Sequence, residues 1–336
     1  MTAVPVSQAS PASPPVLAGC PMYPADNVWN VPIDTLPVDP NSAAYVSAMG
    51  SSAKAHADFG SGIWPDPGGF PIGIPYTTVL GTQPKVSVLF DYWAESDPGP
   101  YPIPNNVPIE GDPTSGDRHI LIVDQTNCVL YEMWDSRKIG GQWYAGSGAI
   151  FTLTQNAPLR PAGWTSADAA GLPILPGLVR YDEAASGEIN HAIRFTSSST
   201  KNSYIWPARH KAPYNLAAGS PPMGQRFRLK ASFSIDSRFK PEEQVILRAL
   251  KKFGMILADN GSSWYLSGVP DERWNNDDLH AFDTYLKGSD FEAVDESALI
   301  VNQDSWQALQ GFALNVNPSV RSIDPGGSAQ YFFTFQ

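Results

Sequence analysis

The distribution of apolar residues along the chain predicts a fold built mainly of short β-strands. Arg118–Asp124 and Cys128–Trp134 are rich in β-branched and aromatic residues, and a short polar turn separates them, which is typical of a hairpin. Apolar side chains occupy both faces of these two runs, so we expect the strands to be covered on both sides. Further strands are expected at residues 85–93, 149–154, 189–196, 203–206, 225–233, 255–258 and 264–267.

Glycine and proline residues between these runs favour an antiparallel β-sandwich, jelly-roll-like, over βαβ units. One helix is well specified at Pro241–Phe253, because an apolar stripe follows a proline and two glutamates and ends near two lysines. A weaker helix is predicted at Asp277–Leu286, and Asp259–Gly261 is typical of a tight hairpin turn. The sequence therefore predicts a mainly β fold with one or two short helices.

Composition divides the chain into segments. Residues 1–19 are rich in Ser, Pro and Ala and are expected to form a disordered lead or linker. Residues 20–300 are expected to form a single β-rich catalytic or binding domain. A separate tail follows from residue 301 to residue 336.

The chain has 336 residues and a net charge of −11 at pH 7, from 22 Lys and Arg against 33 Asp and Glu. A negative chain without a basic run repels nucleic acid and anionic lipid, so neither is expected as a partner. No apolar stretch has the length of about 18 residues that a membrane-spanning helix needs, so membrane insertion is not expected either.

Cys20 and Cys128 are the two cysteines of the chain, and neither lies in a metal-binding spacing. An even pair of this kind suits one disulfide. Because disulfides persist in oxidising compartments, we expect a secreted or cell-surface protein. Two unrelated buried thiols are the alternative, since free cysteine is among the most buried residue types.

Sequence motifs for nucleotide, zinc-protease, esterase and calcium sites are absent, so candidate chemistry is argued from strand faces. An even turn between the two hairpin strands would pair Val123 with Cys128 and Leu121 with Leu130, and would place His119 opposite Glu132. A carboxyl group among Leu and Trp neighbours has its pKa raised, as a general acid requires. A purely structural His–Glu pair is the alternative.

The loop at Arg160–Asp168 offers an aromatic platform, hydroxyl groups and a carboxylate between two expected strands. This combination suits sugar recognition, with Trp164 and Asp168 as the candidate residues. The alternative is a buried Trp164 anchor, with Asp168 capping the turn that follows.

His191 lies on the more apolar face of its expected strand, where a core histidine is the alternative to a catalytic one. Trp206, Arg209 and His210 bring an aromatic ring, a cation and an imidazole to another strand end. No metal is expected. His119, His191 and His210 could still hold one metal ion together, although no two of them share a local ligand spacing.

Several motifs resemble those of a family of secreted bacterial β-rich proteins whose activity is uncharacterised. They are Asn27–Asn30, Gly116–His119, Arg160–Asp168 and Ala258–Ser262, and the resemblance spans about residues 21–294.

The tail motifs Phe312–Pro318 and Pro325–Tyr331 resemble the opening strands of a bacterial immunoglobulin-like module, over about residues 312–336. The resemblance implies that residues 301–336 are a linker followed by truncated immunoglobulin-like strands. It also implies a monomer within a longer, multidomain extracellular protein.

These observations favour an extracellular glycoside hydrolase that acts on a polysaccharide through a pair of carboxyl groups. Glu132 is expected as the acid, with Asp168 or Asp117 as its partner. His119 and His191 are further catalytic candidates. The substrate-binding residues are expected to be Trp134, Trp164, Trp206, Arg209 and His210.

The sequence leaves two alternatives open. A polysaccharide lyase would use His191 or a tyrosine to take the C5 proton of a uronic acid, while Arg209, Arg194 or Arg228 neutralises the sugar carboxylate. A non-enzymatic carbohydrate-binding or adhesion domain would instead use the surplus of Trp and Tyr as a binding face.

Overall fold

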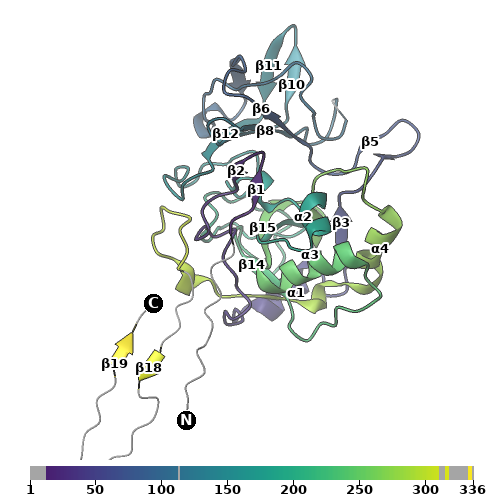
Figure 1. Ribbon diagram of the computed structural model, residues 1–336, viewed down its shortest axis with the longest axis vertical. Coiled ribbons are helices and arrows are strands. Elements are labelled where there is room, and N and C mark those ends of the chain that lie inside the picture. The colour runs from purple at the N-terminus through teal and green to yellow at the C-terminus, as the bar shows by residue number, and fades with distance from the viewer. Residues whose placement is uncertain (1–12, 113, 310–314, 318–331, 335–336) are drawn as a thin grey trace, which may run out of the picture.

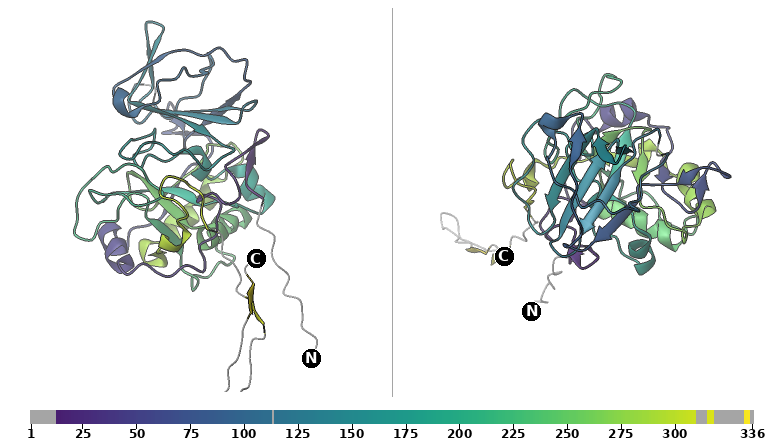
Figure 2. Two further views of the ribbon diagram at one scale, coloured as in Figure 1. Left: turned by 90° about the vertical axis from the view of Figure 1, so that its left-hand side faces the viewer. Right: turned by 90° about the horizontal axis from the view of Figure 1, so that it is seen from above.

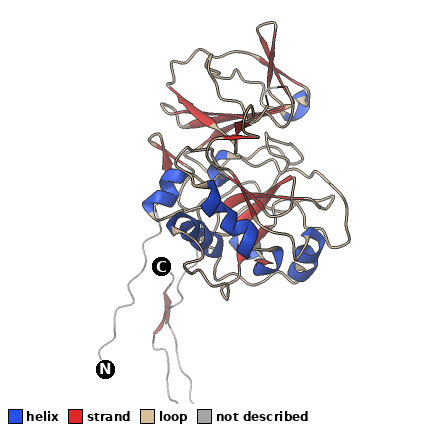
Figure 3. Cartoon of the chain, turned by 90° about the vertical axis from the view of Figure 1, so that its right-hand side faces the viewer, coloured by secondary structure: helices blue, strands red, loops and turns tan. Residues whose placement is uncertain are grey.

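The computed structural model describes residues 13–112, 114–309, 315–317 and 332–334. Over these residues the fold is mainly β, as predicted, with one larger sheet in the upper part and one in the lower part of the molecule as drawn in Figure 1. The α-helices of the described residues lie in the lower part (Figure 3), and they number four rather than one or two. They are α1 (Ser42–Met49), α2 (Tyr181–Ser186), α3 (Pro241–Lys252) and α4 (Asn276–Tyr285).

The lower sheet has six strands in the order β17-β14-β15-β13-β16-β3. They are β3 (His56–Asp58), β13 (Ile193–Ser197), β14 (Arg226–Leu229), β15 (Met255–Asn260), β16 (Tyr265–Ser267) and β17 (Phe291–Ala293). β13 runs parallel to β15 and β3 runs parallel to β16, whereas the other pairs are antiparallel. The sheet is therefore mixed, and the expectation of a purely antiparallel fold is wrong on this point.

β13 lies between β15 and β16 and pairs with both. The turn at Asp259–Gly261 therefore closes no hairpin, contrary to the prediction, because the two strands that flank it are not neighbours in the sheet. The parallel pairing places Asp259 opposite Thr196 near the carboxyl ends of β15 and β13. This is the edge at which sheets with parallel strands commonly bind ligands.

The upper sheet has four strands in the order β12-β9-β8-β6. They are β6 (Tyr76–Val79), β8 (Ile120–Asp124), β9 (Val129–Trp134) and β12 (Ser147–Thr152). Leu121 and Leu130 belong to the main hydrophobic core, whereas Ile122 and Met133 belong to a second apolar cluster. The predicted coverage on both faces is confirmed.

The second face of the upper sheet is covered by a small three-stranded sheet, seen at the top of Figure 2, left. Its strands are β7 (Val88–Phe90), β10 (Arg137–Ile139) and β11 (Gln142–Ala145). Burial on both sides explains why β8 is a continuous apolar run rather than an alternating one.

β8 and β9 pair in a register that differs from the expected one. Leu121 lies opposite Glu132 and not opposite Leu130, because the turn runs from Gln125 through Cys128. His119 is therefore not the cross-strand partner of Glu132. Glu132 remains on the same face as Leu121, and this face points into the main core.

The predicted helices are confirmed with small shifts at their ends. α3 begins at Pro241, and the side chain of Glu243 accepts a hydrogen bond of 2.7 Å from the backbone N–H of Lys240. α4 begins after Asn275, whose side chain accepts from the backbone N–H groups of Asp277 and Asp278. No helix in the described part of the chain combines the length and the apolar character needed to cross a membrane.

The amino-terminal end is ordered earlier than expected. β1 (Val16–Leu17) pairs with β2 (Cys20–Pro21), so the disordered lead predicted through residue 19 is wrong at these positions, and residues 1–12 lie outside the described residues. Cys20 forms a disulfide with Cys128, 108 positions further along the chain. The predicted disulfide is confirmed, and it ties β2 to the turn between β8 and β9.

The folded domain extends past residue 300. Trp306 is buried, and its ring lies edge-on to the ring of Tyr23 with 5.7 Å between centroids. Ala308 is buried as well, so the start of the expected linker packs against the rest of the described chain. Further on, β18 (Asn315–Asn317) pairs with β19 (Phe332–Thr334), and the remainder of the expected immunoglobulin-like motifs lies outside the described residues.

Candidate active site

A cavity of about 430 Å³ lies where the upper and lower parts of the molecule meet. Asp117 precedes β8, Trp134 ends β9, and Asp259 lies near the end of β15, so both sheets contribute to its walls. Its lining among the described residues comprises Tyr92, Glu95, Asp117, Trp134, Ser147, residues 165–169, His210, Ala212, Asp259 and Asn260.

The lining of this cavity is acidic. Glu95, Asp117, Asp168 and Asp259 contribute carboxyl groups, and His210 is the one described lining side chain that can carry a positive charge. The Nδ1–H of His210 donates to the backbone oxygen of Ala169 (2.7 Å), and its Nε2 lies 3.9 Å from a carboxylate oxygen of Glu95. Such a cavity favours neutral or cationic ligands over anionic ones.

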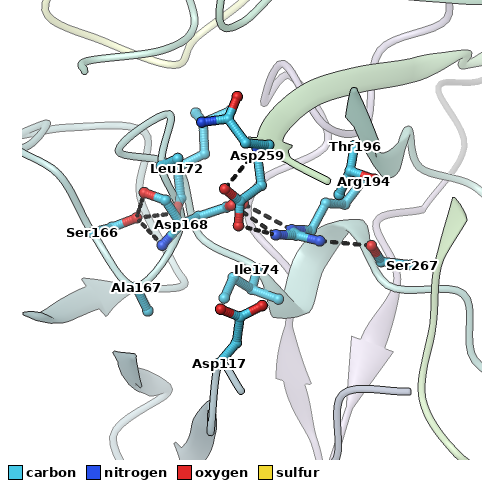
Figure 4. A network of polar contacts seen from close by, with 12 residues as sticks. Asp117, Ser166, Ala167, Asp168, Leu172, Ile174, Arg194, Thr196, Asp259 and Ser267 are labelled. Atoms are coloured by element: carbon cyan, nitrogen blue, oxygen red, sulfur yellow. Dashed lines mark hydrogen bonds and ion pairs between the residues drawn. The ribbon is translucent and has the colours of Figure 1, made fainter. Parts of the chain in front are cut away.

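The floor is built around Arg194, a side chain of β13 that is buried (Figure 4). Its Nε and Nη2 donate to the two carboxylate oxygens of Asp168 at 3.0 and 2.9 Å. The same Nη2 donates to Asp259 Oδ2 at 2.8 Å, and Nη1 donates to Ser267 Oγ at 2.7 Å. One guanidinium group therefore serves two carboxyl groups.

Asp259 is the carboxyl group that this arrangement leaves without a full counter-charge. Burial raises its pKa, the negative charge of Asp168 raises it further, and Arg194 lowers it, with the result that the pKa stands at about 7. Its side chain is 21% exposed, whereas that of Asp168 is fully buried. Asp259 can therefore hold a proton near neutral pH and present it to the cavity.

Asp117 is an exposed carboxylate on the opposite wall. The indole N–H of Trp134 donates to its Oδ1 at 3.0 Å, which fixes the orientation of the carboxylate. The Trp134 ring lies 6.2 Å from the ring of Tyr92 and is tilted by 33° from it. Two aromatic rings beside two carboxyl groups form the kind of lining that binds one face of a sugar ring and hydrogen-bonds its hydroxyls.

Glu132 does not lie at the cavity rim, where the sequence placed it. Its side chain is fully buried and accepts hydrogen bonds of 2.9–3.0 Å from the backbone N–H groups of Ile174 and Leu175. Burial raises its pKa to about 7, against the opposing effect of these hydrogen bonds. Its role is to hold the 3₁₀ turn at Leu175–Gly177, and the expectation of an accessible acid at this position is wrong.

His119 is buried as well, between the two parts of the molecule. Its Nδ1 forms an ion pair with Glu110, and its Nε2–H donates to the backbone oxygen of Ala167 at 3.0 Å. Burial lowers the pKa of this imidazole, but the charges of Glu110 and Asp117 outweigh burial and raise it to about 9. The imidazolium thus positions the acidic wall rather than facing Glu132.

Glu110, Asp117 and His119 form the one group of described residues whose donor atoms lie close enough to hold a metal ion, all within 4.8 Å of one another. With Nε2–H bound to a carbonyl, the Nδ1 atom of His119 would be the ligand. The Nδ1 atom already carries the proton that pairs with Glu110, so a metal ion would have to displace this proton.

The three histidines of the alternative metal site do not come together in the described part of the chain. His191 is fully buried, with Nδ1 bound to the backbone oxygen of Ala192 (2.7 Å) and Nε2 at 3.3 Å from Glu183. His119 and His210 bind different carbonyls, and among the described residues the three imidazoles form no group that could share an ion. His191 is a satisfied core histidine and lines no part of the cavity.

The other expected binding residues are mostly structural. Trp206 is buried and donates through its indole N–H to the backbone oxygen of Ser305 (2.9 Å). Arg209 donates to the backbone oxygens of Arg160 and Gln303. The guanidinium group of Arg160 lies over the ring of Trp164, 5.7 Å from the ring centroid. The residues that the structure does bring together at the cavity are Asp117, Trp134, Asp168 and His210.

Sequence reasoning missed several cavity residues, among them Tyr92, Glu95 and Asp259. Tyr92 lies at the end of the strand expected at residues 85–93, and Glu95 lies between that strand and the proline-rich run that starts at Pro98, where no motif marks either residue. Asp259 was assigned to a turn because an Asn-Gly pair follows it. A signal was nevertheless present, since an aspartate directly after a buried apolar run is typical of the carboxyl end of a strand at a ligand site.

Comparison of the chain with protein-family models, with curated proteins and with solved structures gave no match. The candidate function therefore depends on the geometry of the cavity.

Proposed function

We propose that the chain is an extracellular glycoside hydrolase that cleaves a polysaccharide in the cavity between its two parts. One observation carries the proposal: a carboxyl group that retains its proton near neutral pH, Asp259, shares a cavity with an exposed carboxylate, Asp117, beside the ring pair of Tyr92 and Trp134. Glycosidic bonds are cleaved by a protonated carboxyl group acting with an ionised one. The disulfide supports the extracellular location.

In the proposed reaction, Asp259 transfers its proton to the glycosidic oxygen while the bond between that oxygen and the anomeric carbon breaks. Asp117 either takes a proton from the attacking water or attacks the anomeric carbon itself, in which case water releases the sugar in a second step. In both routes, one water molecule adds across one glycosidic bond. Arg194 holds Asp259 in place and stabilises its carboxylate after the transfer.

The acidic lining supports a neutral or amino-sugar polymer as the substrate. The lyase alternative needs a cation that faces the carboxylate of a uronic acid. Arg194 is occupied by Asp168 and Asp259, and Arg228 donates to Glu292 and to three backbone oxygens. Arg209, the third candidate, donates to the backbone oxygens of Arg160 and Gln303 and pairs with Asp304. Because all three cations are already paired within the protein, these contacts favour hydrolysis over the lyase alternative.

The experiment measures release of reducing ends from a panel of neutral, amino-sugar and uronic-acid polysaccharides. Asp259→Asn and Asp117→Asn are each expected to lower kcat by about 10²–10⁴-fold, the contribution typical of general acid–base catalysis. Asn mimics the protonated Asp259, so the thermal midpoint should stay near that of the unmodified protein. The wild-type rate should fall as the pH rises through about 7, because Asp259 then loses its proton.

Asp182→Asn is the matched control, because this aspartate is 81% exposed and lies outside the cavity. It should retain full activity. Sugar retention without new reducing ends would identify a binding or adhesion domain instead. Products that absorb in the near ultraviolet, formed from uronic-acid polymers, would identify a lyase.

A further inference from the structure

A second cavity, of about 500 Å³, lies outside the proposed active site. It is formed by β3, the start of α4 and the hairpin of β4 (Ile63–Trp64) with β5 (Phe70–Pro71), which projects to the right in Figure 1. Its described lining comprises His56, Ala57, Asp58, Phe59, Trp64, Ile72, Asn276, Leu279, His280 and Asp283.

The lining combines an apolar floor with polar groups at the rim. Phe59 and Leu279 are buried on the floor, whereas Trp64 is 74% exposed on the hairpin. His56 Nδ1 lies 2.9 Å from Asp283 Oδ1, and His280 Nδ1 lies 3.4 Å from Asp283 Oδ2. An exposed indole face beside a hydrogen-bonded set of imidazoles and a carboxylate suits a sugar ring, which has an apolar face and a polar edge.

The hairpin that carries Trp64 is fixed to the body of the protein. The backbone N–H of Ser61 donates to the side-chain oxygen of Asn276 (2.9 Å), and the side-chain amide of Asn276 donates to the backbone oxygen of Ser61 (3.0 Å). Because this reciprocal pair ties the base of the hairpin to the first residue of α4, the Trp64 side of the cavity is held against the His280 side.

Residues on neighbouring strands of the lower sheet link the second cavity to the first one. Asp58, which lines the second cavity, lies opposite Ser267 in the β3–β16 pair. Ser267 Oγ accepts from Arg194, and Arg194 holds Asp259 in the first cavity. Only one strand, β16, therefore separates the strand of Asp58 from the strand of Arg194.

The groups that shift the pKa of Asp58 also link the two cavities. Desolvation by its surroundings raises the pKa of the Asp58 carboxyl and His56 lowers it, and the charges of Glu110, Arg194 and Asp117 also act on it. Asp117 belongs to the first cavity. Asp58 therefore lies within the electrostatic range of the proposed active site although it lines the other cavity.

We propose that the second cavity binds the same polysaccharide chain at a distance from the bond that is cleaved, so that the protein acts on long chains at internal positions. This inference rests on the proposed function for its substrate class. Trp64 is the principal binding residue of the second cavity, and His56 and His280 bind sugar hydroxyls there.

The experiment compares affinity for neutral oligosaccharides of increasing length, from disaccharide to octasaccharide, by calorimetry on the inactive Asp259→Asn variant. Trp64→Ala in this background should weaken binding of the octasaccharide about tenfold, as for an aromatic residue that dominates a contact surface. It should leave the disaccharide affinity unchanged. Tyr285→Ala is the control, because this exposed aromatic residue belongs to α4 but does not line the cavity.

The outcomes separate this inference from the proposed function. If reducing ends never appear but affinity rises with chain length and falls in Trp64→Ala, hydrolysis is wrong and the second binding cavity stands. If Trp64→Ala and Tyr285→Ala bind every length alike, the second cavity is overturned, whatever the activity. Failure of all oligosaccharides to bind overturns both.

Discussion

Asp168 and Asp259 are both held by Arg194, yet only one of them can meet a substrate. Asp168 receives two hydrogen bonds from the guanidinium and is fully buried, whereas Asp259 receives one and is 21% exposed. A single positive charge cannot balance two carboxylates, so the less well paired one retains a proton. The buried aspartate therefore supports the site, and the exposed one is the candidate acid.

Glu132 provides a prediction at the level of single residues. Glu132→Gln keeps one oxygen, which can accept from Ile174 and Leu175 as Oε1 does, but it places a buried NH₂ group where Oε2 accepts from the N–H of Ile174. We expect the free energy of unfolding to fall by about 1–3 kcal/mol, the usual cost of an unsatisfied buried polar group. Denaturant titration measures this loss, and kcat measured well below the new melting temperature should stay within a few-fold of wild type.

The opposite result would restore Glu132 to the mechanism. A variant with unchanged stability and no activity would mean that this carboxyl group reaches the substrate despite its burial. Asp182→Asn again provides the reference, because it removes only an exposed ion pair with Arg273.

Among the elements, the segment from Arg160 to Leu172 does most to shape the cavity. The Nε of Arg160 donates to the backbone oxygen of Thr165 at 2.8 Å, and its Nη2 donates to that of Glu95 at 2.6 Å. Ser166 Oγ donates to the backbone oxygen of Leu172 at 2.6 Å. The loop between the two sheets is therefore held by hydrogen bonds from its own side chains. These bonds keep Asp168 in contact with Arg194, although the loop contains no helix or strand.

The disulfide gives a prediction at the same scale. Replacing Cys20 and Cys128 together by Ser removes a link that closes 108 positions of chain. Because a loop of about 100 residues loses substantial entropy on closure, we expect a loss of about 2–5 kcal/mol in unfolding free energy. Denaturant titration with and without reductant measures it. Reductant should lower the midpoint of the wild type only, and an equal effect on both proteins would contradict the assignment.

On the scale of the whole molecule, burial of several carboxyl groups makes stability depend on pH. Burial raises the pKa values of Glu132, Asp259 and Glu296 to about 7 each. The folded state therefore keeps protons that the unfolded state has lost above about pH 4–5. Above neutral pH, His119 also keeps a proton in the folded state that the unfolded state loses, since its pKa is raised to about 9.

The sign follows from proton linkage. Between about pH 4 and 7 the folded state binds more protons than the unfolded state, so stability falls as the pH rises, and His119 extends the fall to about pH 9. Below about pH 4 the trend reverses, because Arg180 and His191 overcome the effect of burial and lower the pKa of Glu183 to about 2. Thermal midpoints measured from pH 3 to 9 should therefore peak near about pH 4–5.

A matched variant isolates one contributing group. Glu296→Gln removes a buried carboxyl that contacts Arg226 at 3.2 Å and should reduce the decline between about pH 4 and 7 by up to about 1.4 kcal/mol per pH unit. A midpoint that rises steadily from pH 5 to 8 in the wild type would contradict the raised pKa values of these groups.

The sequence alone determined the features that depend on neighbouring residues or on composition. Apolar runs with β-branched residues specified β8 and β9, and a proline, two glutamates and an apolar stripe specified α3. The count of two cysteines specified the disulfide, and the surplus of acidic residues agrees with an acidic cavity. These properties follow from local propensity, periodicity and charge, which any window of the sequence contains.

Only the tertiary structure decided which carboxyl groups share the cavity. The position of one turn set the register of β8 and β9, so that Leu121 and not His119 lies opposite Glu132. The insertion of β13 between β15 and β16 places Asp259 at the cavity wall and not in a hairpin turn. Both outcomes depend on pairing between segments far apart in the chain. Because a strand carries the same local pattern whichever partner it pairs with, the partners and hence the site are fixed only when the sheets assemble.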